Sequence, residues 1–323
     1  MLLVIVFATF FFSRILPANA AGFRVLSQDG VEIGVWYPSD TATISQRLGP
    51  YEVDIARDAP IKKGTHQIIL FSHGNGGYYR NHYLTALTLA DAGFVVAAPQ
   101  HQADYFIGGE KTARALNHRY LELDAALRAV LAAPDFRGHV NGDAVHGLGY
   151  SLGGATILLA AGAEYSSEYV LQHCRLNKVA DVEFCEYSGT TEPPGHNFSL
   201  PRTTDPFRNK PLTNGKVVLV APAFQGLGIK ESFSATSLTV FAIEGDRIIK
   251  PKFHARPLID AVPPRLPTDF QSIPGHHYAF IAPFPKWLTD KEDIPVASDP
   301  EGFDRQSFLT DLNARILSAF LAK

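Results

Sequence analysis

The chain has 323 residues, of which 46% are hydrophobic and 19% are charged, and its formal net charge is -3 at pH 7. This composition is that of a globular protein, which excludes a disordered or fibrous chain, and the charge balance gives no basic surface for nucleic acid. The length suits one α/β domain with insertions, since such domains often reach roughly 250 residues.

The N-terminal segment has the pattern of an export signal. Residues 2–12 form an apolar run that is too short to span a bilayer, and residues 17–20 (PANA) end in the small-x-small pattern of a signal peptidase site. We therefore expect residues 1–20 to be a signal peptide and the mature chain to be periplasmic or secreted. No Lys or Arg precedes Arg14, so an uncleaved anchor is the alternative.

Beyond this segment, short β-type runs alternate with longer helix-type stretches, which is typical of a mostly parallel sheet with helices on both faces. We therefore expect one α/β domain over residues 21–323, with a sheet of about eight strands. The predicted strands are Gly22–Leu26, Val31–Tyr37, Gln67–Ser72, Phe94–Pro99, Ala144–Tyr150, Lys216–Ala221, Leu238–Ile243 and Asp269–Ile273. The predicted helices are Tyr83–Ala92, Ala113–Ala132, Leu152–Ala163, His254–Ala261 and Phe308–Leu321.

Residues 164–214 interrupt this alternation, because they show little periodicity where a short connection would suffice. Loops of this length are usually functional, so we expect a cap insertion that folds back over the strand ends. A surface insertion without such a role is the alternative. The segment contains Cys174 and Cys185, with no second pair to complete a zinc site. They predict one disulfide in an oxidising compartment, and two unpaired thiols are the alternative.

A serine motif lies at the expected end of one of these strands. Residues 149–154 read GYSLGG and connect the apolar run 144–148 to the helical stretch 155–163. A serine in G-x-S-x-G at a strand-to-helix turn is typical of the nucleophile elbow of a hydrolase, because glycines on both sides permit so tight a turn. Ser151 is therefore the candidate nucleophile.

A glycine-rich loop follows the predicted strand Gln67–Ser72, where residues 73–77 read HGNGG. Its backbone can approach a substrate closely, so we expect the N–H groups of Asn75 and Leu152 to form an oxyanion hole. A purely structural turn is the alternative. His73 precedes the serine in the chain, and we expect it to hold this loop rather than to act as a base.

Candidates for the acid and the base follow later strands. Asp246 and its competitor Glu244 follow the strand Leu238–Ile243, and we favour Asp246 because a turn glycine precedes it. A solvated acidic side chain is the alternative for either. A doublet, His276 and His277, follows the last strand. The chain order Ser, Asp, His is the order of the α/β-hydrolases, but the order does not choose within the doublet.

Further segments carry a resemblance to a known family. They are residues 35–38 (VWYP), 48–51 (LGPY), 56–60 (ARDAP), 71–74 (FSHG), 92–99 (AGFVVAAP) with His101 beyond it, 149–154 and 302–305 (GFDR). With these, the chain resembles the α/β-hydrolase superfamily, and within it the exported predicted dienelactone hydrolases, which are similar to platelet-activating-factor acetylhydrolases. The resemblance runs from Gly22 almost to the C-terminus. It implies the α/β-hydrolase fold, with Ser151 as nucleophile, Asp246 as acid and His277 as base, because the family pattern His-aromatic-x-Phe fits residues 277–280.

Two departures from these relatives bear on specificity. Dienelactone hydrolase proper has a cysteine nucleophile, and acetylhydrolases of the platelet-activating-factor type place the acid one strand earlier than Asp246. Neither specificity is therefore transferred, and what remains is serine ester hydrolysis.

We accordingly expect a serine hydrolase that cleaves carboxylic esters of small or medium acyl chain. Its substrate would be a small-molecule or lipid-like ester, and we expect no metal or other cofactor, no nucleic acid and no stable protein partner. The alternatives are an acyltransferase or peptidase with the same triad, which the triad does not distinguish, and a non-catalytic binding protein on the hydrolase fold.

Overall fold

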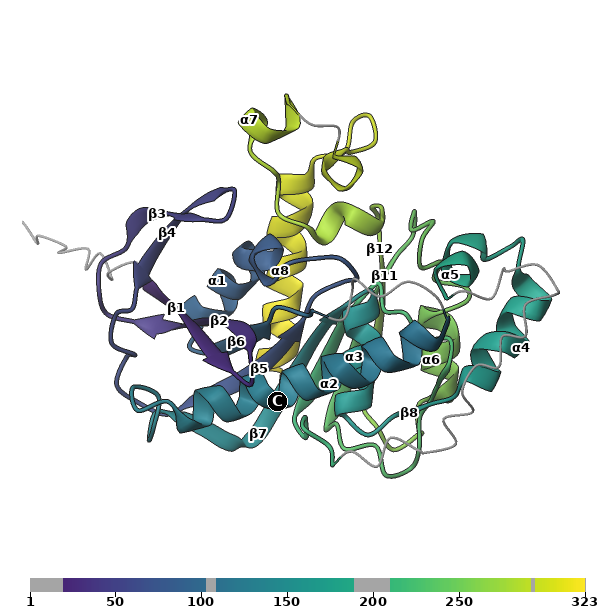
Figure 1. The fold of residues 1–323 in the computed structure, drawn as a ribbon, viewed down its shortest axis with the longest axis horizontal. Helices are drawn as coiled ribbons and strands as arrows, with labels where there is room; N and C mark the ends of the chain where they lie inside the picture. Colours follow the sequence, from purple (N-terminus) through teal and green to yellow (C-terminus); the bar gives the residue numbers. More distant parts are fainter. Residues whose placement is uncertain (1–19, 103–108, 189–209, 292–293, 323) are drawn as a thin grey trace, which may run out of the picture.

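The computed structural model describes residues 20–102, 109–188, 210–291 and 294–322 (Figure 1). The predicted signal peptide lies outside the described residues except for Ala20, which begins the first strand. Residues 189–209 of the predicted cap insertion also lie outside them.

The core of the protein is a ten-stranded sheet with the order β12-β11-β9-β7-β5-β6-β2-β1-β4-β3. Its strands are β1 (Ala20–Gln28), β2 (Val31–Ser39), β3 (Ile44–Leu48), β4 (Tyr51–Arg57), β5 (His66–Ser72), β6 (Val95–Pro99), β7 (Val140–Tyr150), β9 (Lys216–Val220), β11 (Ser237–Ile243) and β12 (Thr268–Ile273). From β6 to β12 all neighbouring strands are parallel, whereas β2 is antiparallel to both β6 and β1. The carboxyl ends of the parallel strands therefore share one edge, which is where ligands bind in open α/β sheets.

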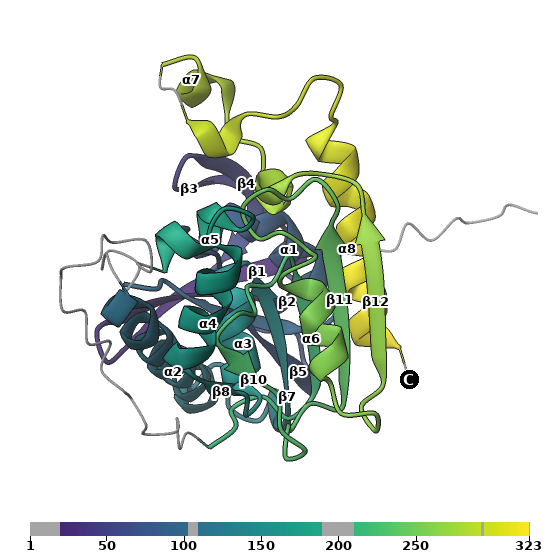
Figure 2. The same ribbon diagram turned by 90° about the vertical axis from the view of Figure 1, so that its right-hand side faces the viewer.

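Helices cover both faces of this sheet. One face carries α1 (Tyr83–Asp91) and α8 (Arg305–Leu321), and the other carries α2 (Gly109–Ala132), α3 (Leu152–Ala160) and α6 (Ala255–Ala261), as the edge-on view in Figure 2 shows. Successive residues of a strand point to opposite faces, so β5 contributes to both cores. Ile68 and Leu70 pack with residues of α2 and α3, and Ile69 and Phe71 pack with residues of α1 and α8.

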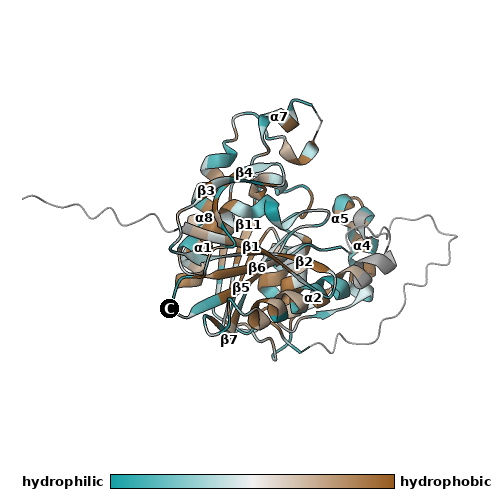
Figure 3. Ribbon diagram, turned by 60° about the vertical axis from the view of Figure 1, so that its left-hand side comes forward, coloured by the Kyte–Doolittle hydropathy of each residue, from teal (hydrophilic) through white to brown (hydrophobic). Residues whose placement is uncertain are grey.

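Hydrophobic residues concentrate along the central strands, among them β5 and β6 (Figure 3). A strand that is covered on both faces is buried along its whole length, which is why these segments are continuous apolar runs rather than alternating ones. Residues 68–72 of β5 and all of β6 are buried. No helix in the described ranges is both long enough and apolar enough to cross a membrane.

The sequence prediction of an α/β architecture is confirmed, and a strand or helix is present at each predicted position, with ends that shift by up to a few residues. The predicted number of about eight strands was wrong, because the hairpin β3–β4 adds two strands at the edge beyond β1. In β4 the residues Tyr51, Val53 and Ile55 are buried and alternate with the exposed residues Glu52 and Asp54. This period of two is the signal that identifies a strand with one buried face.

The segment expected to lack periodicity contains regular structure in its described part. It begins with β8 (Glu164–Tyr165), which pairs with β10 (Leu227–Gly228), and continues with α4 (Ser167–Asn177) and α5 (Val182–Tyr187). Only three residues of α4, Val170, His173 and Cys174, are buried. With so few buried positions, one of them a histidine, the helical spacing of three and four is hard to recognise in the sequence.

The remaining short elements are η1 (Tyr79–His82), η3 (His277–Phe280), α7 (Lys286–Thr289) and η4 (Pro295–Ala297). They lie in the connections around the carboxyl edge of the sheet, and η1 and η3 bring residues to the site described next.

Candidate active site

Ser151 occupies a strained turn between β7 and α3. Its backbone has φ 55° and ψ -121°, a conformation that non-glycine residues rarely adopt. The neighbouring sheet holds the turn in place, because the Ser151 N–H donates to the Val220 carbonyl at 3.1 Å and the Ala223 N–H donates to the Ser151 carbonyl at 3.0 Å. A Cβ on Gly149 would lie 2.5 Å from the carbonyl oxygen of Gly153. The turn therefore requires glycine here, and it places the Ser151 hydroxyl above the carboxyl end of β7.

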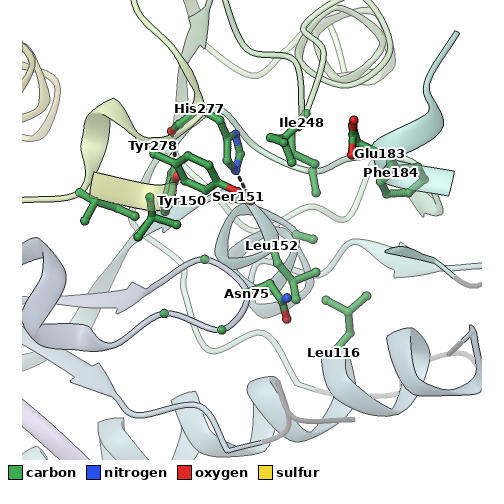
Figure 4. A pocket seen from close by; sticks show the side chains of 18 of the residues that line it. Asn75, Leu116, Tyr150, Ser151, Leu152, Glu183, Phe184, Ile248, His277 and Tyr278 are labelled. Atoms are coloured by element: carbon green, nitrogen blue, oxygen red, sulfur yellow. Dashed lines mark hydrogen bonds between the residues drawn. The ribbon is translucent and has the colours of Figure 1, made fainter. Parts of the chain in front are cut away.

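His277 lies between Ser151 and Asp246, and Figure 4 shows its ring beside Ser151. Its Nδ1 is 2.6 Å from Asp246 Oδ2, and its Nε2 is 3.1 Å from Ser151 Oγ. Because a carboxylate accepts and does not donate, Nδ1 carries the hydrogen and Nε2 is left as the acceptor for the serine hydroxyl. All three side chains are buried, so these hydrogen bonds form where water competes little.

The turn after β11 orients Asp246. Its Oδ1 accepts hydrogen bonds from the backbone N–H groups of Ile248 and Ile249, both at 2.8 Å, which leaves Oδ2 to face His277. The competitor Glu244 is exposed and accepts instead from the hydroxyl of Ser272 at 2.9 Å. The structure thus brings Asp246, and not Glu244, to the imidazole.

Of the two adjacent histidines, only His277 reaches Ser151. His276 Nε2 lies 2.8 Å from Asp299 Oδ1, and neither residue lines the pocket that contains Ser151. His277 begins η3, and the backbone there turns its side chain toward the elbow.

The glycine-rich loop after β5 lies against the elbow. A Cβ on Gly74 would come within 3.0 Å of the Tyr150 ring and 3.4 Å of Ser151 Cβ, so the absence of a side chain lets the loop pack closely here. Asn75 of this loop and Leu152, the first residue of α3, both line the pocket beside Ser151. The first N–H groups of a helix have no acceptor within the helix, which suits the Leu152 N–H to a developing negative charge.

His73 serves the loop and not the serine. Its Nδ1–H donates to the Gly74 carbonyl at 2.7 Å, and its Nε2 accepts from the His101 N–H at 3.1 Å. Burial, together with the charge of Arg119, lowers the pKa of His73 to about 3, so the ring stays neutral. This is the structural role predicted for it.

Ser151 opens into a pocket of about 330 Å³. Most of its lining is apolar, and it includes Leu116, Leu152, Ala155, Tyr165, Phe184, Leu227, Ile248, Ile249, Tyr278, Ile281 and Val296. Two lining residues, Glu183 and Phe184, come from α5 within the insertion, and Figure 4 shows them across the pocket from His277. Sequence reasoning did not identify these wall residues, because nothing local distinguishes them from ordinary helix or loop residues.

The described part of the insertion is crosslinked internally by a disulfide and is attached to the rest of the domain through a buried carboxylate. The predicted bond between Cys174 and Cys185 joins α4 to α5. Between these helices, Asp181 Oδ2 accepts from His173 Nε2 at 2.8 Å and from His254 Nε2, next to α6, at 3.2 Å. Burial alone would raise the pKa of Asp181, but the two imidazole donors outweigh it and bring this pKa to about 2. The insertion is therefore attached at its α5 end, close to the pocket.

One grouping in the described residues has the composition of a metal site. Ligand atoms of His173, Cys174 and Cys185 lie within 4.8 Å of one another. Both sulfur atoms belong to the disulfide, however, and metal binding requires thiolates. The geometry of this grouping is that of a covalent crosslink beside a histidine.

Comparison with known proteins gives one partial match. Residues 39–122 match the family "Platelet-activating factor acetylhydrolase, isoform II", whereas no curated protein matches the chain. The matched part is about a quarter of the chain and runs from the end of β2 into α2, so it contains the glycine-rich loop but not Ser151, Asp246 or His277. The chain is thus similar over this region to a family of ester hydrolases, which supports a hydrolase on this α/β fold.

Proposed function

We propose that the protein is a serine hydrolase that cleaves carboxylic esters through an acyl-enzyme on Ser151. The observation that carries the proposal is the unbroken chain of hydrogen bonds from Ser151 Oγ through His277 to Asp246, beside an apolar pocket. A hydroxyl becomes a competent nucleophile when a neutral imidazole accepts its proton and a carboxylate orients that imidazole.

In the first half of the reaction, His277 Nε2 takes the proton of the Ser151 hydroxyl while Oγ attacks the ester carbonyl carbon. The carbonyl oxygen becomes an oxyanion, which the N–H groups of Asn75 and Leu152 stabilise. His277, now cationic beside Asp246, returns the proton to the leaving oxygen. An alcohol departs and the acyl group remains on Ser151.

In the second half, water takes the place of the alcohol. His277 accepts one of its protons as the water oxygen attacks the acyl carbonyl, and the same two N–H groups hold the second oxyanion. Collapse of this intermediate releases the carboxylic acid, and Oγ recovers its proton from His277. The cycle needs no group beyond the residues already named.

The pocket favours neutral esters with a small or medium acyl chain. Its volume of about 330 Å³ is near the lower end of the roughly 300 to 1,000 Å³ of ligand pockets. The described lining residues include the carboxylate of Glu183 but no Lys or Arg. An anionic ester would therefore meet a like charge and no compensating cation.

A covalent probe tests the nucleophile. A fluorophosphonate added to the purified protein should label Ser151, and labelling should be lost in Ser151→Ala but kept in Ser45→Ala, which changes an exposed serine of β3. His277→Ala should slow labelling strongly, whereas His276→Ala, which changes the adjacent histidine, should not. An adduct at another serine, or equal labelling of both histidine variants, would contradict the assignment.

Turnover then tests the bond that is cleaved. Neutral nitrophenyl esters of rising acyl length should be hydrolysed, with kcat/KM falling once the chain exceeds the pocket, and an ester with a carboxylate on its acyl chain should be a poorer substrate. If Ser151 is labelled but only an amide or an added acyl acceptor reacts, the protein is a peptidase or an acyltransferase. The absence of both labelling and turnover would indicate a binding protein.

We also propose that the mature protein acts outside the cytoplasm, after cleavage behind Ala20. The disulfide supports this proposal, because such bonds persist in oxidising compartments. N-terminal sequencing of the full chain expressed in a bacterium with a C-terminal tag should give Ala21 as the first residue. An intact N-terminus in the membrane fraction would identify an anchor instead.

A further inference from the structure

Helix α2 carries two buried polar side chains, Arg119 and Glu122, beneath the glycine-rich loop. The exposed fraction of Arg119 is 0%, although the residue does not line the pocket. Burying a guanidinium costs several kcal/mol unless hydrogen bonds compensate for the lost water. The partners of Arg119 therefore indicate what the charge does in this position.

Those partners belong to the two segments that carry the proposed oxyanion donors. Arg119 Nε donates to Thr156 Oγ1 at 3.0 Å, and Nη2 donates to the His73 carbonyl and lies 3.3 Å from Ser72 Oγ. Thr156 Oγ1 donates in turn to the Leu152 carbonyl at 3.1 Å. One rigid, planar group thus connects the start of α3, which presents the Leu152 N–H, to the end of β5, where the glycine-rich loop begins.

Glu122, about one turn further along α2, bonds to the segment that follows β6, and through His101 it is connected to the glycine-rich loop. Its Oε2 accepts from His101 Nδ1 at 2.6 Å, and its Oε1 accepts from the Gln102 N–H at 3.0 Å. The His101 N–H reaches His73, whose ring is bonded to the Gly74 carbonyl. Burial lowers the pKa of His101 well below its usual value, so this ring is neutral and its Nε2 accepts from the Ser72 hydroxyl at 2.8 Å.

Ser72, His101 and Glu122 are connected by hydrogen bonds in the serine–histidine–carboxylate order of a catalytic triad. This second set of residues has no access to substrate. The exposed fractions of Ser72 and His101 are 0% and 1%, and Ser72 Oγ lies within reach of the Arg119 guanidinium. A hydroxyl enclosed in this way cannot attack a bound ester. The arrangement is a support for the loop.

We propose that Arg119 is a positioning residue that sets the separation and direction of the Asn75 and Leu152 N–H groups. This inference rests on the proposed function, because it assigns a role in stabilising the oxyanion of that reaction. Arginine suits the task because its fork of donors serves two acceptors at fixed angles, whereas the single ammonium of lysine has no planar geometry. Without the guanidinium, the Asn75 and Leu152 N–H groups stay in their own segments, but their positions relative to each other are no longer fixed.

The test compares Arg119→Lys with Arg128→Lys, an exposed arginine of the same helix that pairs with Asp29 and Asp124. With a neutral nitrophenyl ester, Arg119→Lys should lower kcat by about 10²-fold, the lower end of what loss of one oxyanion donor costs. KM should change little, because the pocket walls are intact, and the pH profile of kcat should keep its shape, because His277 is untouched. Arg128→Lys should match the wild type.

Thr156→Val provides a second variant that breaks the same connection without changing a buried charge. It should also lower kcat at nearly constant KM, and the double variant should lose less than the product of the two single effects, because both act on one link. If Thr156→Val is folded and keeps full kcat, or if a folded Arg119→Lys does so, the inference is overturned. If the wild type and Arg128→Lys hydrolyse no ester, the proposed function fails, and this inference fails with it.

Discussion

The hydroxyl of Tyr150 donates a hydrogen bond to the backbone carbonyl of His277 at 2.7 Å, and the two rings lie 5.3 Å apart. The residue directly before Ser151 therefore holds the loop that carries the imidazole. Burial raises the pKa of Tyr150 well above its usual value, so the hydroxyl remains protonated and remains a donor. Ser151 and His277 are thus connected through the backbone as well as through their own side chains.

Tyr150→Phe removes the hydrogen bond to the His277 carbonyl and keeps the packing of the ring. We expect stability to fall by about 1 kcal/mol, because the His277 carbonyl loses its buried donor. We expect kcat to fall about tenfold, which is less than the ~10²-fold that a 1 Å misplacement can cost. Tyr79→Phe removes a hydroxyl bonded to Glu32, outside the pocket, and should leave kcat unchanged. Equal activity of wild type and Tyr150→Phe would show that the loop does not need this hydrogen bond.

Asp246→Asn should nearly abolish turnover while the protein stays folded. The amide oxygen can still accept from the Ile248 and Ile249 N–H groups, but the amide nitrogen would then face His277 Nδ1 and favour the wrong tautomer. By analogy with serine proteases, kcat should fall about 10⁴-fold. Glu244→Gln serves as the control and should retain activity, and a reversed outcome would identify Glu244 as the acid.

Gly153→Ala tests the contact between α3 and the end of β5. An added Cβ would overlap the carbonyl oxygen of Ser72, so the helix start and the strand end would have to move apart. Overpacking of this kind costs about 1 to 3 kcal/mol, and we expect a matching fall in denaturation midpoint together with a large loss of kcat. Gly142→Ala, where the added Cβ would meet only the end of the Leu131 side chain, should change both quantities little.

Stability should fall in mild acid because buried histidines resist protonation. Burial, with a contribution from Lys216, lowers the pKa of His146 from 6.5 to about 4. Between these values the unfolded chain binds a proton that the folded chain does not, so the stabilisation from this group is complete above pH 6.5 and decreases as the pH falls toward 4. At pH 5 the decrease amounts to about 2 kcal/mol.

His146→Asn can isolate this contribution, since an amide oxygen can replace Nδ1 as acceptor for the Lys216 N–H. The variant should be less stable at neutral pH, because it loses ring contacts with Phe94 and Phe320. Its free energy of unfolding should nevertheless fall by about 2 kcal/mol less than that of the wild type between pH 7 and pH 5. Urea titrations at both pH values measure the free energy of unfolding. An equal decrease in the wild type and the variant would exclude His146 as the source of the loss of stability in acid.

Replacement of both Cys174 and Cys185 by Ala should loosen the insertion and leave the triad intact. A crosslink over so short a loop contributes about 3 kcal/mol. Because Phe184 and Glu183 line the pocket from α5, we expect KM for a neutral ester to rise several-fold while kcat changes little. A fall in kcat at constant KM would mean that the crosslink acts on the catalytic groups and not on the wall.

Local patterns in the sequence predicted the central strands and helices and the position of the serine, but not β3, β4, α4 or α5. The elbow could be read from residues 149–154 because the turn itself requires Gly149, whose added Cβ would meet Gly153 and Gly154, whereas Gly153 and Gly154 pack against Ser72 and Pro222, far away in the chain. The alternation of β-type and helix-type segments likewise predicted the parallel sheet, and with it the edge where the candidates for acid, base and oxyanion loop would meet. The turn glycine at position 149 and the alternation of segment types are both short-range properties of the chain.

The pairings at the site depended on the tertiary structure. Asp246 and Glu244 are two residues apart, and His276 and His277 are adjacent. A turn glycine favoured Asp246 and a family pattern favoured His277, but neither showed which side chains reach Ser151. Their direction is set by the turn at Ile248 and Ile249 and by the start of η3. The contact with Ser151 is made by His277, which is 126 positions away in the chain, so it depends on how the folded chain brings the two together.

The residues of the pocket wall and those that support the glycine-rich loop could not be identified from the sequence for the same reason. Glu183 and Phe184 lie in a segment without clear periodicity in the sequence, and Arg119 looks like one charge among many on α2. Only the packing of α5 over the strand ends, and of α2 beneath β5 and α3, gives them a role. The sequence by itself identified Ser151 as the candidate nucleophile, and the tertiary structure decided which distant side chains surround it, because those contacts form only once the sheet brings its strand ends together.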